Sequence, residues 1–311
     1  MSGWTADEMP AMDEATVVVT GANSGLGYEG TRAFADAGAT VVMACRSQDR
    51  GERAASELRH DTDGGDLDVR TCDLADLDSV ERFAEGVCED YDGVDVLCNN
   101  AGVMAIPRQE TTDAFEMQLG VNHMGHFALT GHLLGELRAS DGESRVVTQS
   151  SGAHTAGTMD FGDLHSEQSY GKWAAYGRSK LANLLFAYEL QRRLDEHGVD
   201  DLRSVACHPG YADTDLQFRG PRESGSPVKM GLMKVANALF GQSAAQGALP
   251  MLYAATSDEL IGGEYVGPGG LLNMRGAPEL QTSNEDSRDE ADAERLWTIS
   301  AELTGVTYAF E

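Results

Sequence analysis

The sequence has few lysines and a large excess of acidic residues. Of its 311 residues, 23 are lysine or arginine and 51 are aspartate or glutamate, which gives a formal net charge of −28. A surface with this charge repels nucleic acids and anionic membranes, so neither is expected as a partner. Only four of the basic residues are lysines: Lys172, Lys180, Lys229 and Lys234.

The chain also lacks the cysteine and histidine patterns of metal sites. Its five cysteines are widely spaced, form no C-x-x-C pair and lie mostly in apolar runs, so we expect reduced core residues and no disulfide framework. The histidines show no H-E-x-x-H or other ligand spacing, and we expect no metal site. The cysteines are Cys45, Cys72, Cys88, Cys98 and Cys207.

Long apolar runs are missing as well. None approaches the roughly 18 residues of a membrane-spanning helix. The first residues, MSGWTADEMPAMDEA, are acidic and have neither the basic nor the apolar part of a signal peptide. We therefore expect a cytoplasmic protein without a membrane span. The sequence leaves open whether the chain forms a homo-oligomer.

Short β-branched runs alternate with longer amphipathic stretches. Several of the short runs are apolar almost throughout, as expected for strands buried on both faces. The alternation predicts an α/β fold, a doubly wound parallel sheet with helices on both faces. Without an internal repeat or a dividing linker, residues 1–311 are expected to form a single domain. The expected strands are 16–21, 40–45, 67–72, 94–98, 144–149, 203–207 and 264–266, and the expected helices are 25–37, 48–60, 76–90, 114–138, 174–197 and 243–256.

Two segments depart from this alternation. Residues 211–242 contain FRGPRESGSPVK followed by the apolar MGLMKVANALFG, and we expect them to form a lid segment after the sixth strand. Residues 282–295 hold six acidic residues against two arginines. This second segment predicts the solvated start of an acidic C-terminal helix over about 283–304.

A glycine-rich loop joins the first expected strand to the first expected helix. The stretch TVVVTGANSGLGYEG contains T-G-x-x-x-G-x-G with Gly21, Gly25 and Gly27. Glycines at such a turn let the backbone approach a pyrophosphate, whose charge is met by the helix N-terminus. A glycine turn can also be purely structural, but its position between a strand and a helix favours dinucleotide binding.

The end of the second expected strand indicates which dinucleotide is preferred. A chain that binds NAD(H) usually has an acidic residue about 20 residues further on, which holds the ribose 2′-hydroxyl. Here the strand ends in Ala44-Cys45-Arg46, and Arg46 lies 19 residues past Gly27. Because a guanidinium pairs well with a 2′-phosphate, NADP(H) is favoured over NAD(H). A surface arginine at a helix start is the alternative, and Arg50 is a second nearby cation.

The stretch YGKWAAYGRSK, residues 170–180, offers two tyrosines for a chemical role. On a helix, residues i and i+4 lie on one face, about 5–6 Å apart at Cβ. Tyr176 therefore has Lys180 beside it, whereas Tyr170 has Ala174 at that position. An isolated tyrosine–lysine pair of this spacing is more often a packing contact, so the assignment depends on the remaining motifs.

Further motifs follow the glycine loop in a fixed order. They are NNAG at 99–102, GVNHMGHF at 120–127, VVTQSSGAH at 146–154, YGRSK at 176–180 and HPGYADT at 208–214. Together with TGANSGLG, they make the chain resemble a classical short-chain dehydrogenase/reductase, a Rossmann fold, over about residues 14–275. Within that family, the 25-residue gap from Ser151 to Tyr176 resembles the retinol-dehydrogenase-like branch.

The resemblance implies four catalytic residues. Tyr176 would be the general acid/base, and Lys180 would lower the pKa of the phenol through its charge and hold the nicotinamide ribose. Ser151 would polarise the carbonyl, because the second serine of the pair is the family's usual catalytic one, and Ser150 is disfavoured. Asn122 would place a water that relays protons to Lys180.

The resemblance also implies the cofactor contacts. Asn100 and Ala101 would lie along the cofactor. Asp73 and Leu74 would lie near its adenine, and Thr214 near its nicotinamide end. The full expected set is Gly21, Asn23, Ser24, Gly25, Leu26, Gly27, Arg46, Asp73, Leu74, Asn100, Ala101, Gly102, Tyr176, Lys180, Pro209 and Thr214.

Together these features predict an NADP(H)-dependent oxidoreductase that interconverts a carbonyl and an alcohol by hydride transfer. The substrate is expected to be an apolar small molecule, since the lid segment turns apolar over 230–240 and offers only two lysines. The alternatives are an NAD-preferring dehydrogenase of the same family and a non-catalytic NADP(H)-sensing regulator. Such regulators typically lack the tyrosine or the lysine. A nucleotide-sugar epimerase would carry T-G-x-x-G-x-x-G, which residues 20–27 do not match.

The charge of −28 and the scarcity of lysine resemble cytoplasmic proteins of salt-accumulating archaea, and they predict a halophilic protein of a haloarchaeon. We expect the midpoint of thermal unfolding to rise as KCl is raised from low to molar concentration, because salt screens the repulsion among the carboxylates. Calorimetry in a KCl series measures this shift. A midpoint that does not respond to salt would contradict the halophilic interpretation.

Overall fold

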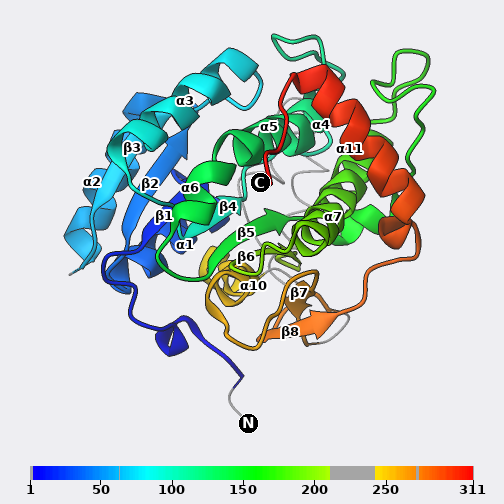
Figure 1. The fold of residues 1–311 in the computed structure, drawn as a ribbon. Coiled ribbons are helices and arrows are strands. Elements are labelled where there is room, and N and C mark those ends of the chain that lie inside the picture. The colour runs from blue at the N-terminus through cyan, green and yellow to red at the C-terminus, as the bar shows by residue number, and fades with distance from the viewer. Residues whose placement is uncertain (1–2, 63, 211–241, 271–272, 311) are drawn as a thin grey trace, which may run out of the picture.

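An eight-stranded sheet forms the centre of the computed structural model, which describes residues 3–62, 64–210, 242–270 and 273–310 (Figure 1). The strands lie in the order β3-β2-β1-β4-β5-β6-β7-β8. All neighbours are parallel except β7 and β8, so the predicted α/β fold with a mostly parallel sheet is confirmed. The strands are β1 (Thr16–Thr20), β2 (Thr40–Cys45), β3 (Leu67–Thr71), β4 (Val96–Asn99), β5 (Ser144–Gln149), β6 (Leu202–Cys207), β7 (Tyr265–Pro268) and β8 (Pro278–Gln281).

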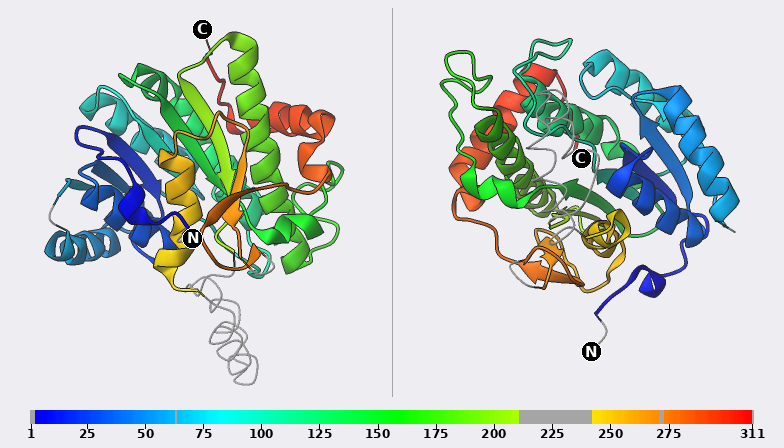
Figure 2. Two further views of the ribbon diagram at one scale, coloured as in Figure 1. Left: turned by 90° about the horizontal axis from the view of Figure 1, so that it is seen from below. Right: turned by 180° about the vertical axis from the view of Figure 1, so that it is seen from behind.

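Helices cover both faces of this sheet (Figures 1 and 2). The alternation of side chains along β1 explains why, since Val17 and Val19 face one helical layer and Val18 faces the other. One layer holds α1 (Gly25–Asp36), α2 (Gln48–Asp61) and α10 (Ala244–Thr256). The other holds α3 (Leu77–Asp90), α5 (Gly125–His132), α6 (Leu134–Ala139) and α7 (Lys172–His197), with α11 (Glu290–Thr304) packed on α7.

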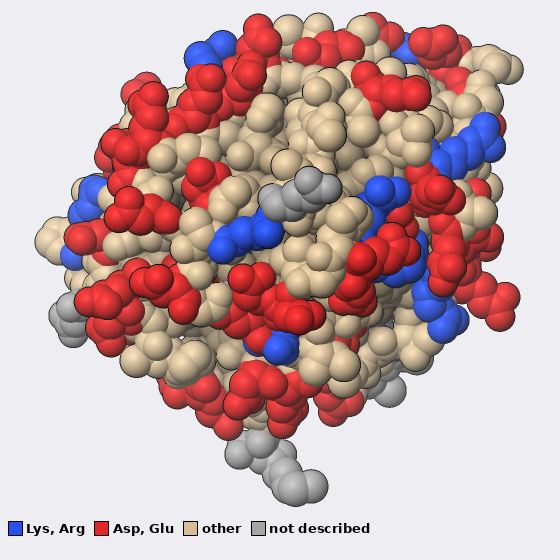
Figure 3. Space-filling model, viewed as in Figure 1, with Lys and Arg blue, Asp and Glu red and all other residues tan. Residues whose placement is uncertain are grey.

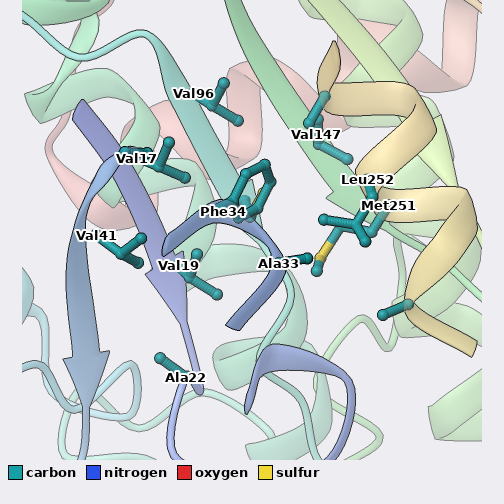
Figure 4. Packing of buried hydrophobic residues seen from close by; sticks show 14 of the residues in the cluster. Val17, Val19, Ala22, Ala33, Phe34, Val41, Val96, Val147, Met251 and Leu252 are labelled. Carbon is teal, nitrogen blue, oxygen red and sulfur yellow. The ribbon is translucent and has the colours of Figure 1, made fainter. Parts of the chain in front are cut away.

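Phe34 anchors α1, the helix that follows the glycine loop, in the first layer. Its ring is fully buried in the cluster that contains Val17, Val19 and Met251 (Figure 4). Any side chain at Gly30 would overlap Met251, so α1 and α10 pack closely at this point. The start of α1 is thereby held at the carboxyl end of β1, where the predicted cofactor residues gather.

The segment expected to be a helix over 114–138 is helical, but it begins at Met117 and is not one continuous α-helix. It forms α4 (Met117–Leu119), a π-helical turn η2 (Gly120–Met124), α5 and α6. In η2, the Gly125 N–H bonds to the Gly120 carbonyl five residues back. Glycine weakens a regular helix, and single π-turns inside helices are frequent at functional sites.

The C-terminal region differs from the prediction in two places. Strand β8 was not expected, because PELQ contains no β-branched residue, and it adds an antiparallel edge to the sheet. The acidic helix expected over about 283–304 begins only at Glu290, after a 3₁₀ turn η5 (Asp286–Arg288). Asp289 caps its start by accepting a hydrogen bond from the Asp292 N–H (2.9 Å).

All five cysteines are free. Cys45, Cys72, Cys98 and Cys207 are buried, as expected. Cys88 is exposed on α3, so the core position expected for it is wrong. The spacing of cysteines in the sequence did not indicate which face of α3 would carry this residue.

The surface is strongly acidic. Aspartate and glutamate side chains are spread over the face seen in Figure 3, with fewer lysines and arginines between them. None of the helices in the described part of the chain has the length and apolar character needed to span a lipid bilayer. The lid segment predicted over about 211–242 lies outside the described residues, apart from Gln242.

Candidate active site

The glycine loop after β1 closes tightly onto the end of β4. Gly21 (φ 68°) and Gly25 (φ 57°) adopt left-handed conformations that other residues rarely take. Gly27 has no space for a side chain, because a Cβ there would overlap the Gly21 carbonyl and lie 2.6 Å from Asn100 Nδ2. Glycines at these positions therefore let the loop and Asn100 approach each other.

A cleft opens beside this loop, at the carboxyl ends of the first strands. It is the place where an open α/β sheet binds a ligand. The absence of side chains at Gly21, Gly25 and Gly27 leaves room for a dinucleotide, so the residues present fit such a group. Twelve of the sixteen predicted cofactor residues line the cleft: Gly21, Asn23, Ser24, Gly25, Leu26, Gly27, Arg46, Asp73, Leu74, Asn100, Ala101 and Gly102.

Six further residues line the cleft and were not in the predicted set. Arg50 lies in the first turn of α2, and it was expected from the sequence only as a second cation near Arg46. Thr20 lies just before the first glycine, and its hydroxyl accepts hydrogen bonds from the Asn100 and Ala101 N–H groups (2.9 Å each). The six are Thr20, Ala44, Arg50, Cys72, Val103 and Val121.

The tyrosine and serine expected to do chemistry meet at the start of α7. Tyr176 is buried, and its phenol is hydrogen-bonded to the side chain of Ser151. Ser151 lies just after β5, where its hydroxyl also accepts from the Ala153 N–H (3.2 Å). The neighbouring Ser150 instead donates to the Lys180 carbonyl (2.8 Å). The hydroxyl of Ser150 thus joins β5 to α7, while that of Ser151 reaches the phenol.

Lys180 connects this pair to the cleft. Its ammonium group is buried and donates to the Gln149 carbonyl (2.9 Å), and burial lowers its pKa to about 8. A Cβ placed on Gly102 would lie 3.6 Å from Lys180 Nζ and 3.0 Å from Asn122 Oδ1. Because Gly102 also lines the cleft, the cleft and the candidate catalytic side chains are contiguous.

Asn122 lies within the π-turn η2 and is fully buried. Its side chain accepts from the Val103 N–H (2.7 Å) and donates to the Val103 carbonyl (2.9 Å). It also donates to Ser179 Oγ on α7 (2.9 Å). These three bonds fix the loop after β4 relative to α7.

The pKa of Tyr176 shifts in the direction opposite to the one expected from the sequence. Burial of the ring raises this pKa, and the hydrogen bond with Ser151 lowers it only in part. The spacing on the helix correctly places Lys180 one turn from Tyr176, but it gives no information about the loss of hydration, which dominates here.

Tyr170 takes part in a different set of contacts. Its hydroxyl donates to the Ile106 carbonyl (2.8 Å) and accepts from Gln118 Nε2 (2.8 Å). Burial raises its pKa to about 12. Gln118 also accepts from the Ala105 N–H (2.6 Å), so Tyr170 and Gln118 together hold the loop that follows the NNAG motif.

Four of the sixteen predicted cofactor residues are not among the described residues that line the cleft, namely Tyr176, Lys180, Pro209 and Thr214. Pro209 follows β6, and its carbonyl accepts from Gln242 Nε2 (2.5 Å). Thr214 lies outside the described residues. Within the described ranges, no group of three or more histidine, cysteine, aspartate or glutamate side chains is placed to hold a metal ion.

Known proteins are similar to this chain in sequence and in fold. A family model described as short chain dehydrogenase matches residues 15–223. Human retinol dehydrogenase 13 is 42% identical over 294 residues, which cover 94% of this chain and 85% of that protein. Mouse retinol dehydrogenase 12 is 40% identical over 294 residues, covering 94% and 87%.

Solved structures give a similar result. An uncharacterized protein from Mycobacterium paratuberculosis is 42% identical, with a TM-score of 0.82 and coverage of 99% of this chain and 100% of that chain. A short chain dehydrogenase from Shigella flexneri 2a, solved in complex with NADP, has the same fold at 23% identity, with a TM-score of 0.62 and coverage of 83% and 98%.

We expect Lys180 to titrate near pH 8 instead of near its ordinary pKa of 10.5, because burial disfavours the charged ammonium. Only four lysines are present, so protein labelled with ¹³C-lysine gives four ε-methylene signals whose pH dependence reports each pKa. Lys180→Met should remove the signal that moves at the lowest pH. Four signals that all titrate above about 10, the range of unperturbed lysines, would contradict the burial of this ammonium.

Proposed function

The chain belongs to the short-chain dehydrogenase family, whose fold binds a nicotinamide dinucleotide, and we propose that it is an NADP(H)-dependent oxidoreductase that interconverts a carbonyl and an alcohol on an apolar small molecule. One observation carries the proposal. Gly102 lines the glycine cleft and at the same time lies against Lys180 Nζ and Asn122 Oδ1, and Tyr176 precedes Lys180 by one turn of α7. The cleft suited to the cofactor therefore adjoins the groups suited to proton transfer.

The roles of the side chains follow from their states and contacts. The dinucleotide, when bound, supplies or accepts the hydride. A raised pKa keeps Tyr176 protonated at neutral pH, which is the form that donates a proton to a carbonyl oxygen during reduction. Ser151, already hydrogen-bonded to this phenol, would donate to the same oxygen and polarise it.

Lys180 and Asn122 would support this proton transfer. With a pKa of about 8, Lys180 is mostly charged at neutral pH, and its ammonium would favour the phenolate form of Tyr176 after proton donation and hold the nicotinamide ribose. Asn122 would hold the turn beside Lys180 where a relay water could bind.

Arg46 and Arg50 support the preference for NADP(H). Both line the cleft after β2, which ends in Cys45, and no acidic residue occupies that end. Two guanidinium groups at this point suit a 2′-phosphate better than a free ribose hydroxyl. The NADP in the Shigella flexneri structure belongs to that protein, and at 23% identity the likeness extends to the fold alone.

The relatives support an apolar substrate. Those named retinol dehydrogenases carry the name of an alcohol with a long apolar body, and two of them cover 94% of this chain at 40% identity or more. We further propose that the single domain works in a salt-rich cytoplasm, for which its net charge of −28 is the support.

Replacing Tyr176 by phenylalanine removes only the phenolic oxygen, which is the proposed proton donor. It should therefore lower kcat by roughly 10²- to 10⁴-fold, the range of general acid/base catalysis. Loss of NADPH absorbance with a panel of carbonyl compounds in concentrated KCl measures turnover. The NADPH dissociation constant, read from cofactor fluorescence, should stay close to that of the unmodified protein.

Tyr170→Phe is the matched control for this variant. It should keep most of the activity and lower the free energy of unfolding by about 1 kcal/mol, because its hydroxyl bonds to Ile106, Glu116 and Gln118, which have no proposed role in the reaction. Near-normal turnover by the Tyr176 variant would show that another group donates the proton.

Arg46→Asp should weaken the use of NADPH much more than that of NADH, since it replaces the partner of a phosphate with a like charge. We expect the ratio of kcat/KM for the two cofactors to fall by about 10- to 100-fold, the range of a lost charge-assisted hydrogen bond. Arg53→Asp makes the same charge change on α2 outside the cleft and should leave the ratio unchanged. If the Arg46 variant also keeps the ratio, the assignment to Arg46 is wrong and Arg50 is the candidate that recognises the 2′-phosphate.

A further inference from the structure

His126 is a buried residue of α5 whose two ring nitrogens both have partners. Nδ1 lies 3.1 Å from the Asn122 carbonyl, and Nε2 lies 2.9 Å from the Thr20 hydroxyl. A carbonyl oxygen can only accept, so the proton of the neutral ring is on Nδ1. Nε2 is then an acceptor, and the Thr20 hydroxyl donates to it.

Of the two partners of the His126 ring, Thr20 is the one that lines the cleft. Its hydroxyl oxygen accepts the N–H groups of Asn100 and Ala101, and its own carbonyl accepts from Asn100 Nδ2 (2.7 Å). The hydroxyl proton has a second acceptor in the Cys98 carbonyl, at 3.2 Å, compared with 2.9 Å to His126. His126 thus accepts the shorter of the two possible bonds and orients the Thr20 hydroxyl, which in turn binds the N–H groups of the NNAG loop.

Asn122, the other partner of the His126 ring, belongs to the residues proposed to support proton transfer. Its side chain is committed to Val103 and Ser179, so the bond from His126 to its carbonyl acts on the backbone of the π-turn itself. The backbone of His126 is fixed in turn, because its carbonyl accepts from the Thr130 hydroxyl (2.8 Å), which accepts from Asn99 (2.9 Å). The ring therefore joins two elements from a fixed position.

The ring is held in its neutral form. Burial lowers the pKa of His126 to about 4, and the nearby positive charge of Lys180 acts in the same direction. A charged ring would carry protons on both nitrogens and could no longer accept from Thr20. The neutral state is thus the one that the geometry of both hydrogen bonds requires.

We infer that His126 is a positioning residue of the proposed reaction, a neutral imidazole that ties the Asn122 turn to Thr20 and the NNAG loop. The inference rests on the proposed function, because the two tied elements are those assigned to proton transfer and to the cofactor. It concerns the chain's own geometry and can be tested with and without the cofactor.

Two amide variants separate the two bonds. His126→Asn places an N–H donor near the position of Nδ1 and should keep the bond to Asn122 but lose the one to Thr20. His126→Gln places an acceptor near the position of Nε2 and should keep the bond to Thr20 but lose the one to Asn122. We expect the first to raise the NADPH dissociation constant by about fivefold with kcat little changed. The second should lower kcat by about tenfold with the dissociation constant little changed, each the effect of one buried hydrogen bond. His126→Leu should show both effects.

His123→Asn is the matched control, because asparagine does not reach the position of Nε2, through which His123 bonds to Ser300. His123 is equally buried three residues earlier but bonds to Ser300 on α11 (2.8 Å), away from the cleft. This variant should lower the midpoint of unfolding while kcat and the dissociation constant stay within about twofold, the effect of losing a hydrogen bond outside the site. If the His126 variants likewise change only the midpoint of unfolding, the residue is merely structural and the inference is wrong.

A spectroscopic test needs no cofactor. In protein labelled with ¹⁵N-histidine, the ring of His126 should remain in the Nδ1–H neutral form at neutral pH. His154 and His197 also face a carbonyl through Nδ1, so the signals that His126→Asn removes identify the ring of His126. An Nε2–H or charged ring at this position would overturn the inference. Failure of the proposed function looks different, because the unmodified protein would then neither bind NADPH nor turn over any carbonyl, while the ring signals would remain as expected.

Discussion

The hydrogen bond from the buried ammonium of Lys180 to the Gln149 carbonyl joins the central helix α7 to the end of β5. Most of the candidate site depends on this junction. It brings Tyr176 and Ser151, which come from α7 and from the chain after β5, within hydrogen-bonding reach. A buried cation is unfavourable unless it is paired, and the carbonyl offsets part of that penalty. The same burial keeps the pKa of Lys180 near 8, far enough below its ordinary value to matter at physiological pH.

Much of the fold could be predicted from local sequence, and so could the cleft. The apolar runs of β1, β2 and β5 predict their strands because both faces of each strand are buried. The glycine loop predicts the cleft, because only glycine tolerates the close approach at Gly27. The helix over 114–138 was predicted as continuous, because the segment is buried on nearly all sides and has no narrow apolar face whose displacement would mark the π-turn. The short edge strand β8 depends on its pairing with β7, which no pattern within PELQ reveals.

The contacts that the sequence did not reveal join distant segments. Thr20 and His126 are 106 residues apart, and no local spacing relates them. The direction of the Tyr176 pKa was missed for a similar reason, because the position of a neighbouring charge follows from helical spacing but the exclusion of water follows from the packing of the whole domain. A sequence pattern identifies candidate groups, and the fold determines their protonation states.

The acidic surface has a consequence for how quickly an anionic cofactor reaches the cleft. A dinucleotide, which is an anion, meets long-range repulsion as it approaches a protein of net charge −28. Dissolved salt shortens the range of this repulsion to about 3 Å at molar concentration, compared with about 10 Å at 0.1 M. Encounter should therefore accelerate with ionic strength, the reverse of the usual behaviour of enzymes that attract their ligands. In the proposed function, Arg46 and Arg50, which line the cleft, would attract the cofactor only over the last few ångströms.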